Sequence, residues 1–283
     1  MLRLRLAMTE LEMSEHNSIF ITGGGSGIGR AIAQRFVREG WFIGLADINR
    51  AGMDETAALL PEGKFSIHML DVREPEQWDI ALSDFASAAG GRIDALANNA
   101  GVPLGGNLAE LTTEEIDRTL AINLSGVIYG ARAAYPHLKA SAPGSCLVNT
   151  CSAAGLYGQA GMTVYCASKF GVRALTESLD IEWAGDGIRV TDVMPSFVDT
   201  PLLAQSSHTS SNVPIRDRVA AAGLEFTPVE EIAETFWRAV NGDRLHNPVG
   251  KTARKVATAA RWLPSYIRNK SRALAKAGLK PMG

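Results

Sequence analysis

Short apolar runs alternate with longer amphipathic stretches along most of the chain. The runs lie near residues 18–22, 41–46, 64–70, 93–97, 145–151 and 188–194, with a weaker seventh near 245–249. Runs of this length bounded by turn residues are typical of strands, and the stretches between them repeat apolar side chains at helical spacing. The alternation predicts an α/β fold in which helices cover both faces of one doubly wound, parallel sheet of about seven strands. The longest helices are expected at about 112–140 and 162–184.

The same pattern predicts three segments. Residues 17–250 contain the whole alternation without a repeat or a low-complexity linker, which predicts one domain. Residues 1–16 precede the first strand and are expected to be a disordered extension, with Met13 as an alternative start. Residues 251–283 are expected to form basic amphipathic helices. No apolar run reaches the length of a membrane span, and the charged first residues do not resemble a secretory signal.

A glycine-rich turn follows the first strand, in the sequence Thr22-Gly-Gly-Gly-Ser-Gly-Ile-Gly29. Glycines allow the backbone to turn tightly and to approach a pyrophosphate, whose charge the N-terminus of the next helix stabilises. The second strand is followed by Asp47, about 20 residues beyond the turn, where a carboxylate can accept hydrogen bonds from an adenosine ribose. Strand, turn, helix and carboxylate together predict a dinucleotide site.

Ser152, Tyr165 and Lys169 stand thirteen and then four residues apart. Tyr165 and Lys169 project from the same face of a predicted helix, so that the ammonium can favour the ionised phenol. Ser152 ends a predicted strand and can donate a hydrogen bond to a substrate oxygen. The spacing is typical of an oxidoreductase that acts on alcohols and ketones.

Taken together, these motifs resemble the classical short-chain dehydrogenase/reductase family from about residue 18 to about residue 240. The matching segments are Thr22–Gly29, Asp71-Val72, Asn98-Asn99-Ala100-Gly101, Asn123, Ser152, Tyr165-Cys-Ala-Ser-Lys169 and Pro195 to Thr200. The resemblance implies a Rossmann-type sheet and hydride transfer between a nicotinamide and a secondary alcohol or ketone. It makes Tyr165 the general acid/base, with Ser152 on the substrate oxygen and Lys169 also on the nicotinamide ribose. Asn123 would support a water that links Lys169 to solvent.

The resemblance also implies the cofactor contacts. They are Gly23, Gly25, Ser26, Gly27, Ile28, Gly29, Asp47, Asp71, Val72, Asn99, Ala100, Gly101, Tyr165, Lys169, Pro195, Val198 and Thr200. Asp71 and Val72 would flank the adenine. The run from Asn98 to Gly101 has a second interpretation, in which it stabilises the edge of the sheet. Ser196 departs from the family pattern, which usually has Gly after the Pro.

Asp47 and Ser26 bear on the choice of cofactor. A carboxylate at residue 47 repels a 2′-phosphate, and Ser26 stands where a basic residue would bind one. NAD(H) is therefore favoured over NADP(H), although Arg50 lies close enough in the sequence to keep NADP(H) open.

The substrate side is expected to be apolar. Residues 200–226 should form a lid, and its first half, 202–215, carries no Lys, Arg, Asp or Glu. The candidate pocket residues are Val102, Leu104, Ala154 and Leu156. The C-terminal part, with 227–234, 247–250 and 261–264, most resembles the hydroxysteroid and retinol dehydrogenase branch. We therefore expect a hydrophobic or lipid-like substrate.

Charge is unevenly distributed along the chain. Residues 244–283 contain ten Lys and Arg and no Asp or Glu, whereas the other residues contain 18 basic and 30 acidic side chains. Val256, Ala260, Leu263 and Ile267 form an apolar stripe on this basic segment. One interpretation is that it packs on its own or a neighbouring subunit. The alternative is a weak contact with an anionic membrane surface. Nucleic-acid binding is not expected.

Cysteine and histidine usage points away from metals and disulfides. Cys146, Cys151 and Cys166 lack Cys-x-x-Cys spacing, and the five histidines form no ligand pattern. We therefore expect no metal, buried thiols and a reducing cytoplasm. The resemblance implies a homodimer or homotetramer formed through the longest helices. A catalytically idle NAD-binding sensor or scaffold, acting through the basic tail, is the alternative function.

Overall fold

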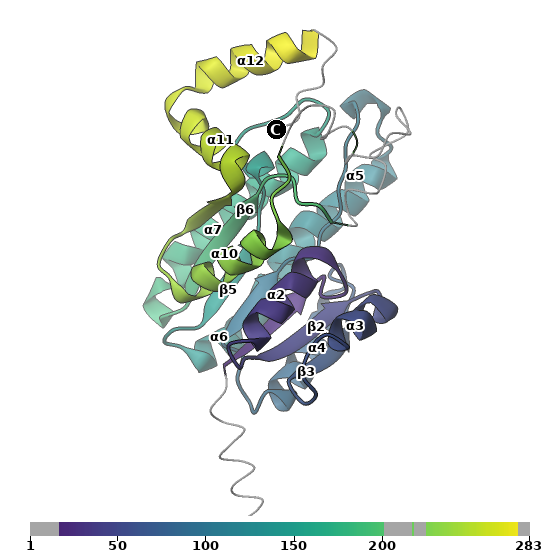
Figure 1. Ribbon diagram of the computed structural model, residues 1–283, viewed down its shortest axis with the longest axis vertical. Helices are drawn as coiled ribbons and strands as arrows, with labels where there is room; N and C mark the ends of the chain where they lie inside the picture. Colours follow the sequence, from purple (N-terminus) through teal and green to yellow (C-terminus); the bar gives the residue numbers. More distant parts are fainter. Residues whose placement is uncertain (1–16, 201–216, 218–224, 277–283) are drawn as a thin grey trace, which may run out of the picture.

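One parallel sheet forms the centre of the molecule. The computed structural model describes residues 17–200, 217 and 225–276. In these residues seven strands pair in the order β3-β2-β1-β4-β5-β6-β7 (Figure 1). They are β1 (Ser18–Thr22), β2 (Phe42–Asp47), β3 (Phe65–Met69), β4 (Ala95–Asn98), β5 (Cys146–Thr150), β6 (Arg189–Pro195) and β7 (His246–Val249). Each strand begins within two residues of its predicted position, and the predicted fold class is confirmed.

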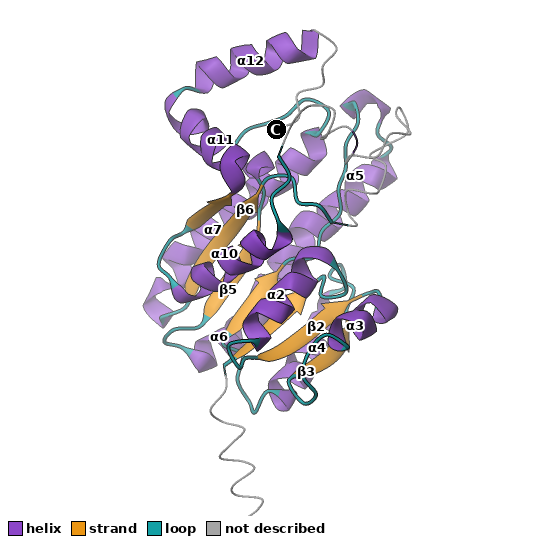
Figure 2. Cartoon of the chain, viewed as in Figure 1, coloured by secondary structure: helices purple, strands orange, loops and turns teal. Residues whose placement is uncertain are grey.

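Helices cover both faces of the sheet (Figure 2). On one face lie α2 (Gly27–Val37), α3 (Arg50–Ala57) and α10 (Val229–Asn241), with buried side chains such as Phe36 and Phe236. On the other lie α4 (Pro75–Ala88), α6 (Gly126–Ser141) and α7 (Thr163–Trp183), with Trp78 and Trp183. Both faces of the central strands are therefore buried, which explains why these strands are apolar throughout instead of alternating.

The strand order reverses between β1 and β4. β1 pairs with β2 on one side and with β4 on the other, so the chain leaves the two neighbouring strands toward opposite halves of the sheet. In open parallel sheets such a reversal opens a crevice at the carboxyl ends of the strands. The glycine turn follows β1 and the Asn98–Gly101 run follows β4, so both predicted cofactor segments lie at this crevice.

The helix predicted at about 112–140 is in fact interrupted. Its parts are α5 (Thr113–Leu120), one π turn, η2 (Ala121–Ser125), and α6. Asn123 lies inside the π turn, and both polar atoms of its side chain bind the backbone of Val102. The interruption serves a contact between distant segments, which helical periodicity cannot reveal. The short helices η1 (Leu108–Glu110), η3 (Ala153–Gly155) and η4 (Ala184–Asp186) complete this half.

The basic segment forms two helices after β7. They are α11 (Gly250–Trp262) and α12 (Pro264–Lys276), and we call them the C-terminal arm. α11 extends from the body of the protein, and α12 runs in a different direction at the end of the molecule (Figure 1). No helix among the described residues has the length and hydropathy of a membrane span. The extension 1–16 and all of the predicted lid except residues 200, 217 and 225–226 lie outside the described residues.

Candidate active site

The glycine turn is held in shape by steric contact. Gly23 and Gly27 have positive φ angles of 68° and 51°, which side chains disfavour. A Cβ atom on Gly29 would lie only 2.1 Å from the carbonyl oxygen of Gly23. Gly29 therefore allows the first turn of α2 to pack directly on the glycine loop. Ile28 packs with the core on this face, and Ser26 precedes the helix without capping it.

Asp47 lies against this turn at the end of β2. Its Oδ2 accepts a hydrogen bond of 3.0 Å from the amide of Gly25, and its Oδ1 accepts one of 3.0 Å from the amide of Asn49. Arg50 donates to Asp54 at 2.9 Å on the surface of α3. The cation that sequence reasoning weighed as a possible phosphate partner is therefore engaged with another carboxylate.

Arg30 is a neighbour of the turn that sequence reasoning missed. Its guanidinium donates to the carbonyl oxygen of Gly25 at 2.9 Å, to Thr56 Oγ1 at 3.0 Å and to Glu55 at 2.8 Å. It therefore ties the glycine turn to α3. Its partners stand five to 26 residues away, so only its position directly after Gly29 could have drawn attention to it.

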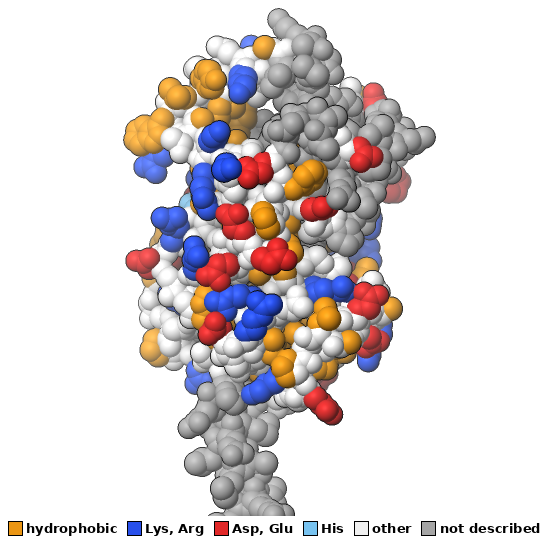
Figure 3. Space-filling model, in the orientation of Figure 1, with side chains coloured by type: hydrophobic (Ala, Val, Ile, Leu, Met, Phe, Trp, Pro, Cys, Tyr) orange, Lys and Arg blue, Asp and Glu red, His pale blue; other side chains and the backbone are white. Residues whose placement is uncertain are grey.

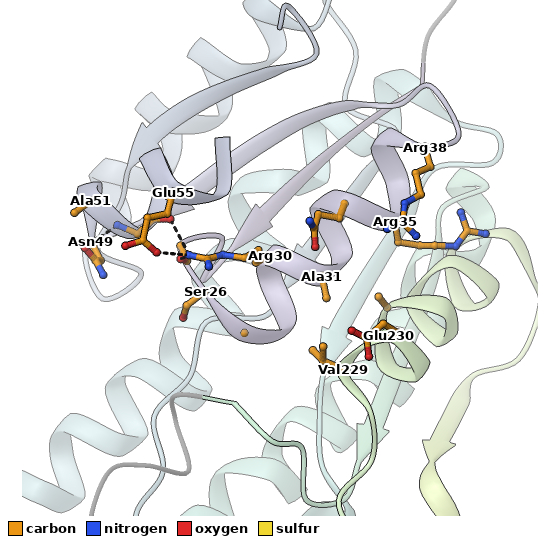
Figure 4. Close-up of a pocket in the computed structure, with 15 residues that line it drawn as sticks. Ser26, Arg30, Ala31, Arg35, Arg38, Asn49, Ala51, Glu55, Val229 and Glu230 are labelled. Carbon is orange, nitrogen blue, oxygen red and sulfur yellow. Dashed lines mark hydrogen bonds and ion pairs between the residues drawn. The ribbon is translucent and has the colours of Figure 1, made fainter. Parts of the chain in front are cut away.

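A cavity of about 450 Å³ adjoins the outer side of the turn (Figure 4). Its walls come from α2, the start of α3 and the start of α10, and it shares only Gly25, Ser26 and Gly27 with the predicted cofactor set. Arg30 and Glu55 face each other at one end, while Arg35 lies farther along α2 and Arg38 lies just beyond its end (Figure 4). None of the predicted catalytic residues lines this cavity.

Thr22 joins the ends of β1 and β4. Its hydroxyl oxygen accepts hydrogen bonds from the amides of Asn99 (2.9 Å) and Ala100 (3.0 Å). Asn99 in turn donates to the carbonyl oxygen of Thr22 at 2.9 Å and accepts from Thr150 at 3.2 Å. These bonds support the interpretation of the Asn98–Gly101 run as a sheet-edge brace. Sequence reasoning missed Thr22 because its partners are 77 and 78 residues away.

The predicted adenine-flanking pair follows β3. Arg73 donates two hydrogen bonds from Nε to the Asp71 carboxylate, at 2.9 and 3.0 Å, and lowers the pKa of Asp71. Val72 is buried, and its carbonyl oxygen accepts a hydrogen bond from the indole of Trp78 at 3.0 Å. Asp71 is thus already paired with Arg73, and the role of the two residues beside an adenine stays a prediction.

Asn123 and Lys169 approach the same glycine. The Asn123 amide donates to the Val102 carbonyl oxygen and accepts from the Val102 amide, both at 2.8 Å, and the residue is fully buried. A Cβ atom on Gly101 would lie 3.2 Å from Asn123 Oδ1 and 3.9 Å from Lys169 Nζ. The predicted fourth catalytic residue and the predicted lysine are therefore brought together across Gly101.

Ser152, Tyr165 and Lys169 also meet. Ser152 follows β5 and lies close enough to Tyr165 to lower its pKa, and its Oγ accepts a hydrogen bond from the amide of Ala154 at 3.1 Å. Lys169 Nζ lies 5.7 Å from the centre of the Tyr165 ring and donates to the carbonyl oxygen of Thr150 at 2.8 Å. Lys169 is only 4 % exposed. The fold thus assembles all four predicted catalytic side chains.

Burial disfavours the charged forms of the two ionisable groups of this cluster. Burial raises the pKa of Tyr165 to about 12, although the hydrogen bond from Ser152 opposes the increase. Burial also lowers the pKa of Lys169.

The segment after β6 borders the same cluster. Pro195 ends β6, and its carbonyl oxygen lies 3.5 Å from Ser152 Oγ. Ser196 has a buried hydroxyl without a hydrogen-bond partner. Val198 is buried and bridges to Thr227, while Thr200 is half-buried at the edge of the described residues. Among the candidate pocket residues, Leu104 and Ala154 are buried, and Val102 and Leu156 are half-buried.

The three cysteines are free and buried, as expected. Burial raises the pKa of Cys151 to about 12, so its thiol next to Ser152 stays protonated near neutral pH. In the described residues, no three His, Cys, Asp or Glu side chains are grouped as metal ligands would be.

Comparison with known proteins gives the following matches. Residues 17–211 match the family described as short chain dehydrogenase. Meso-2,3-butanediol dehydrogenase of Serratia marcescens is 37 % identical over 186 residues, 66 % of this chain and 73 % of that protein. Probable oxidoreductase EphD of Mycobacterium tuberculosis is 30 % identical over 266 residues, 90 % of this chain but only 44 % of that protein. A Burkholderia phymatum short-chain dehydrogenase/reductase in complex with NAD has a TM-score of 0.77 at 26 % identity, covering 90 % of this chain and 95 % of that one.

Proposed function

Because this chain belongs to the short-chain dehydrogenase family, we propose that it transfers a hydride between NAD(H) and a secondary alcohol or ketone. The coarser statement, an oxidoreductase acting on CH–OH or C=O groups, follows from the family and from its relatives. One observation carries the finer proposal: Ser152 lies close enough to Tyr165 to lower its pKa, and the Nζ atom of a buried Lys169 lies 5.7 Å from the centre of the same ring.

A nicotinamide dinucleotide fits the residues at the crevice. The turn has no side chain at Gly23, Gly25 and Gly27, and α2 begins at Gly27, so a pyrophosphate can approach the backbone of the turn and the N-terminus of the helix. Asp47 is already oriented toward the turn by the Gly25 amide. When bound, the cofactor supplies hydride transfer at its nicotinamide and, in its oxidised form, a positive charge.

Tyr165 is the proton carrier in this proposal. Its hydroxyl takes a proton from an alcohol or gives one to a ketone, while Ser152 orients the same substrate oxygen. The pKa of Tyr165, which burial raises to about 12, must fall by several units before the hydroxyl can exchange a proton with the substrate near neutral pH. Lys169 is the buried cation positioned to favour the phenolate, because Nζ is held near the ring by the Thr150 carbonyl oxygen. The Asn123 side chain, across Gly101, is suited to hold a water that connects Nζ to solvent.

NAD(H) is the proposed cofactor rather than NADP(H). The Asp47 carboxylate disfavours a 2′-phosphate, and Ser26 supplies no positive charge. Arg50 is paired with Asp54, and Arg30 is paired with Glu55. Neither guanidinium is therefore free to bind a 2′-phosphate. The complex of the Burkholderia phymatum protein with NAD is consistent with this choice.

The proposed substrate is an uncharged, hydrophobic secondary alcohol or its ketone. Leu104, Ala154, Val102 and Leu156 are apolar, and the related Serratia marcescens protein is a butanediol dehydrogenase. The resemblance of the C-terminal part to hydroxysteroid and retinol dehydrogenases stays a prediction. So do the cytoplasmic location and the lid.

Self-association through the long helices is also proposed. Ile128 on α6 and Phe170 on α7 are 42 % and 41 % exposed, although both are large and apolar. Exposed apolar side chains on the two helices expected to pair with a second copy support a homodimer or homotetramer.

The test combines a panel of substrates with the variant Tyr165→Phe, which lacks the phenolic hydroxyl. Secondary alcohols, steroids and ketones are incubated with NAD(H) or NADP(H), and nicotinamide absorbance is followed. We expect turnover of apolar secondary alcohols with NAD, and a loss of about 10³-fold in kcat for Tyr165→Phe. Tyr129→Phe, which removes a hydroxyl on α6 outside the site, is the matched control. If no compound is turned over although NAD binds, the idle sensor or scaffold becomes the better interpretation.

A further inference from the structure

The two halves of the C-terminal arm are bound to the body very differently. α11 is anchored: Ala253 is fully buried, Arg254 pairs with Glu231 at 3.2 Å, and Lys251 pairs with Glu225 at 3.5 Å. α12 meets α11, and of its residues 264–273 only Ile267 and Ser271 are half-buried while the rest are exposed. Among the described residues, the basic segment thus packs on the body of its own subunit mainly through its first helix.

An apolar patch lies where the two helices join. Trp262, Leu263 and Tyr266 are 69 %, 57 % and 59 % exposed. In the described part of the chain, neither the Trp262 indole nor the Tyr266 hydroxyl makes a hydrogen bond within the protein. Figure 3 shows hydrophobic side chains gathered around this joint with cationic side chains next to them. Three adjacent large apolar side chains on the surface indicate a contact with another apolar phase.

The patch is surrounded by cations that lack acidic partners. Lys255, Arg261, Arg268, Lys270 and Arg272 form no ion pair within the described residues, and Arg261 instead lies 5.2 Å from the Trp262 ring. The whole segment 244–283 contains no carboxylate side chain. The arm is therefore complementary to a negatively charged surface, with aromatic side chains at its centre.

We propose that the C-terminal arm docks on the surface of an anionic lipid bilayer. Trp262, Leu263 and Tyr266 enter the headgroup region, and the flanking Lys and Arg side chains bind lipid phosphates. Amphipathic helices with aromatic and apolar residues on one side and cations on the other bind bilayers in this manner, lying in the interface without crossing it. A second copy of the chain is the less suitable occupant, because two identical basic arms that face each other would bring like charges together.

Docking would place the active site beside the membrane. α11 contacts η3 (Ala153–Gly155), the turn directly after Ser152, so the arm rises from the same end of the sheet as the catalytic residues. This part rests on the proposed function: a hydrophobic alcohol or ketone dissolved in the bilayer would reach the substrate side without crossing bulk water.

The test is co-sedimentation of the full chain with vesicles. Phosphatidylcholine vesicles containing phosphatidylserine should bind the protein at least about tenfold more than pure phosphatidylcholine, and binding should weaken at high salt. The double variant Trp262→Ala/Tyr266→Ala and the triple variant Arg268→Ala/Lys270→Ala/Arg272→Ala should each lose about 10- to 100-fold in partitioning. The matched controls are Ile181→Ala, an apolar side chain 78 % exposed on α7, and Arg38→Ala, an exposed cation directly after α2. Both should bind as wild type does.

Either of two results would overturn the proposal. One is equal partitioning of wild type and both arm variants. The other is an arm-dependent dimer in sedimentation velocity without binding to anionic vesicles, which would make the patch an interface between two copies. Activity on a water-soluble alcohol, measured without vesicles, should be unchanged in the arm variants. Failure of the proposed function would instead appear as absent turnover with vesicle binding intact.

Discussion

The glycine turn and the catalytic cluster differ in how complete each is without a ligand. The turn is set by backbone contacts: Gly29 packs on Gly23, and Asp47 accepts two amide hydrogen bonds. In the predicted catalytic cluster the side chains are positioned, but burial raises the pKa of Tyr165 and lowers that of Lys169, which disfavours the charged form of each. Steric contacts shape the glycine turn in advance. In the proposed function, the charged form of Tyr165 would need the positive charge of a bound cofactor.

This difference predicts that changes at the turn act first on binding, and changes at the cluster act first on turnover. The strongest test is Lys169→Met, which keeps an unbranched apolar chain but removes the buried cation. We expect kcat to fall by about 10³-fold near neutral pH, because Tyr165 then loses its nearest positive charge. Cofactor affinity, measured by NADH fluorescence, should change by no more than about tenfold.

Lys139→Met is the matched control, because Lys139 is an exposed cation on α6 that pairs with Asp186. It should leave kcat unchanged. A Lys169→Met variant with kcat within a few fold of wild type would show that Lys169 does not activate Tyr165.

The converse test is Gly29→Ala at the turn. The new Cβ atom would stand 2.1 Å from the Gly23 carbonyl oxygen, so the turn must open. We expect a loss of about 3 kcal/mol in the free energy of unfolding, and a loss of about 100-fold in NADH affinity. Urea denaturation and NADH fluorescence measure the two effects.

Gly24→Ala provides the matched control in the same turn. Its Cβ atom would meet nothing closer than 3.3 Å, and the φ angle of Gly24 is not positive. Equal effects of the two substitutions would argue against close packing as the reason for glycine at residue 29.

A smaller effect is expected from Asp47→Asn. The amide can still accept from the Gly25 amide, but it no longer repels a 2′-phosphate. The ratio of kcat/KM with NAD to kcat/KM with NADP should fall by about tenfold, equivalent to about 1.4 kcal/mol. Asp54→Asn, which breaks an exposed ion pair with Arg50, should leave the ratio alone. An unchanged ratio in Asp47→Asn would remove Asp47 from cofactor selection.

The smallest effect on activity is expected from a substitution of His246, the first residue of β7. Its Nδ1 lies 2.8 Å from the buried carboxylate of Asp192 on β6, and its Nε2 lies 3.1 Å from Glu177, which also accepts from Arg173. The hydrogen bond to Asp192 raises the pKa of His246, although burial opposes it. Protonated His246 therefore stabilises the fold fully below its ordinary pKa, and this contribution is lost as pH rises through the raised value.

His246→Gln should accordingly lower the free energy of unfolding by about 2 kcal/mol at a pH of about 6, and by less at a pH of about 9. Urea denaturation at the two pH values measures it. His137→Gln is the control, because burial lowers the pKa of His137 and no carboxylate hydrogen-bonds it. A loss of unfolding free energy that grows with pH would contradict a positive charge on His246 at low pH. Unchanged kcat in His246→Gln would limit this ion pair to stability.

The predictability of the molecule depends on how far apart the interacting residues are. Strand positions and the Thr22–Gly29 turn follow from neighbours in the sequence and were predicted closely. Thr22 and Arg30 were missed as structural links because their hydrogen-bond partners stand up to 78 and 26 residues away. The π turn at Asn123 was missed for the same reason, since Val102 is 21 residues away.

By itself, the sequence determined the alternation of strands and helices, the glycine turn, the order of the catalytic motifs and the basic character of the arm. These are local properties, because they depend on periodicity, on the missing Cβ of glycine and on the charge of nearby side chains. Only the tertiary structure decided that Asn123 and Lys169 meet across Gly101, and that burial raises rather than lowers the Tyr165 pKa. It also decided that α12 leaves Trp262 and Tyr266 exposed. Burial and distance arise from packing between remote segments, and local sequence carries no measure of either.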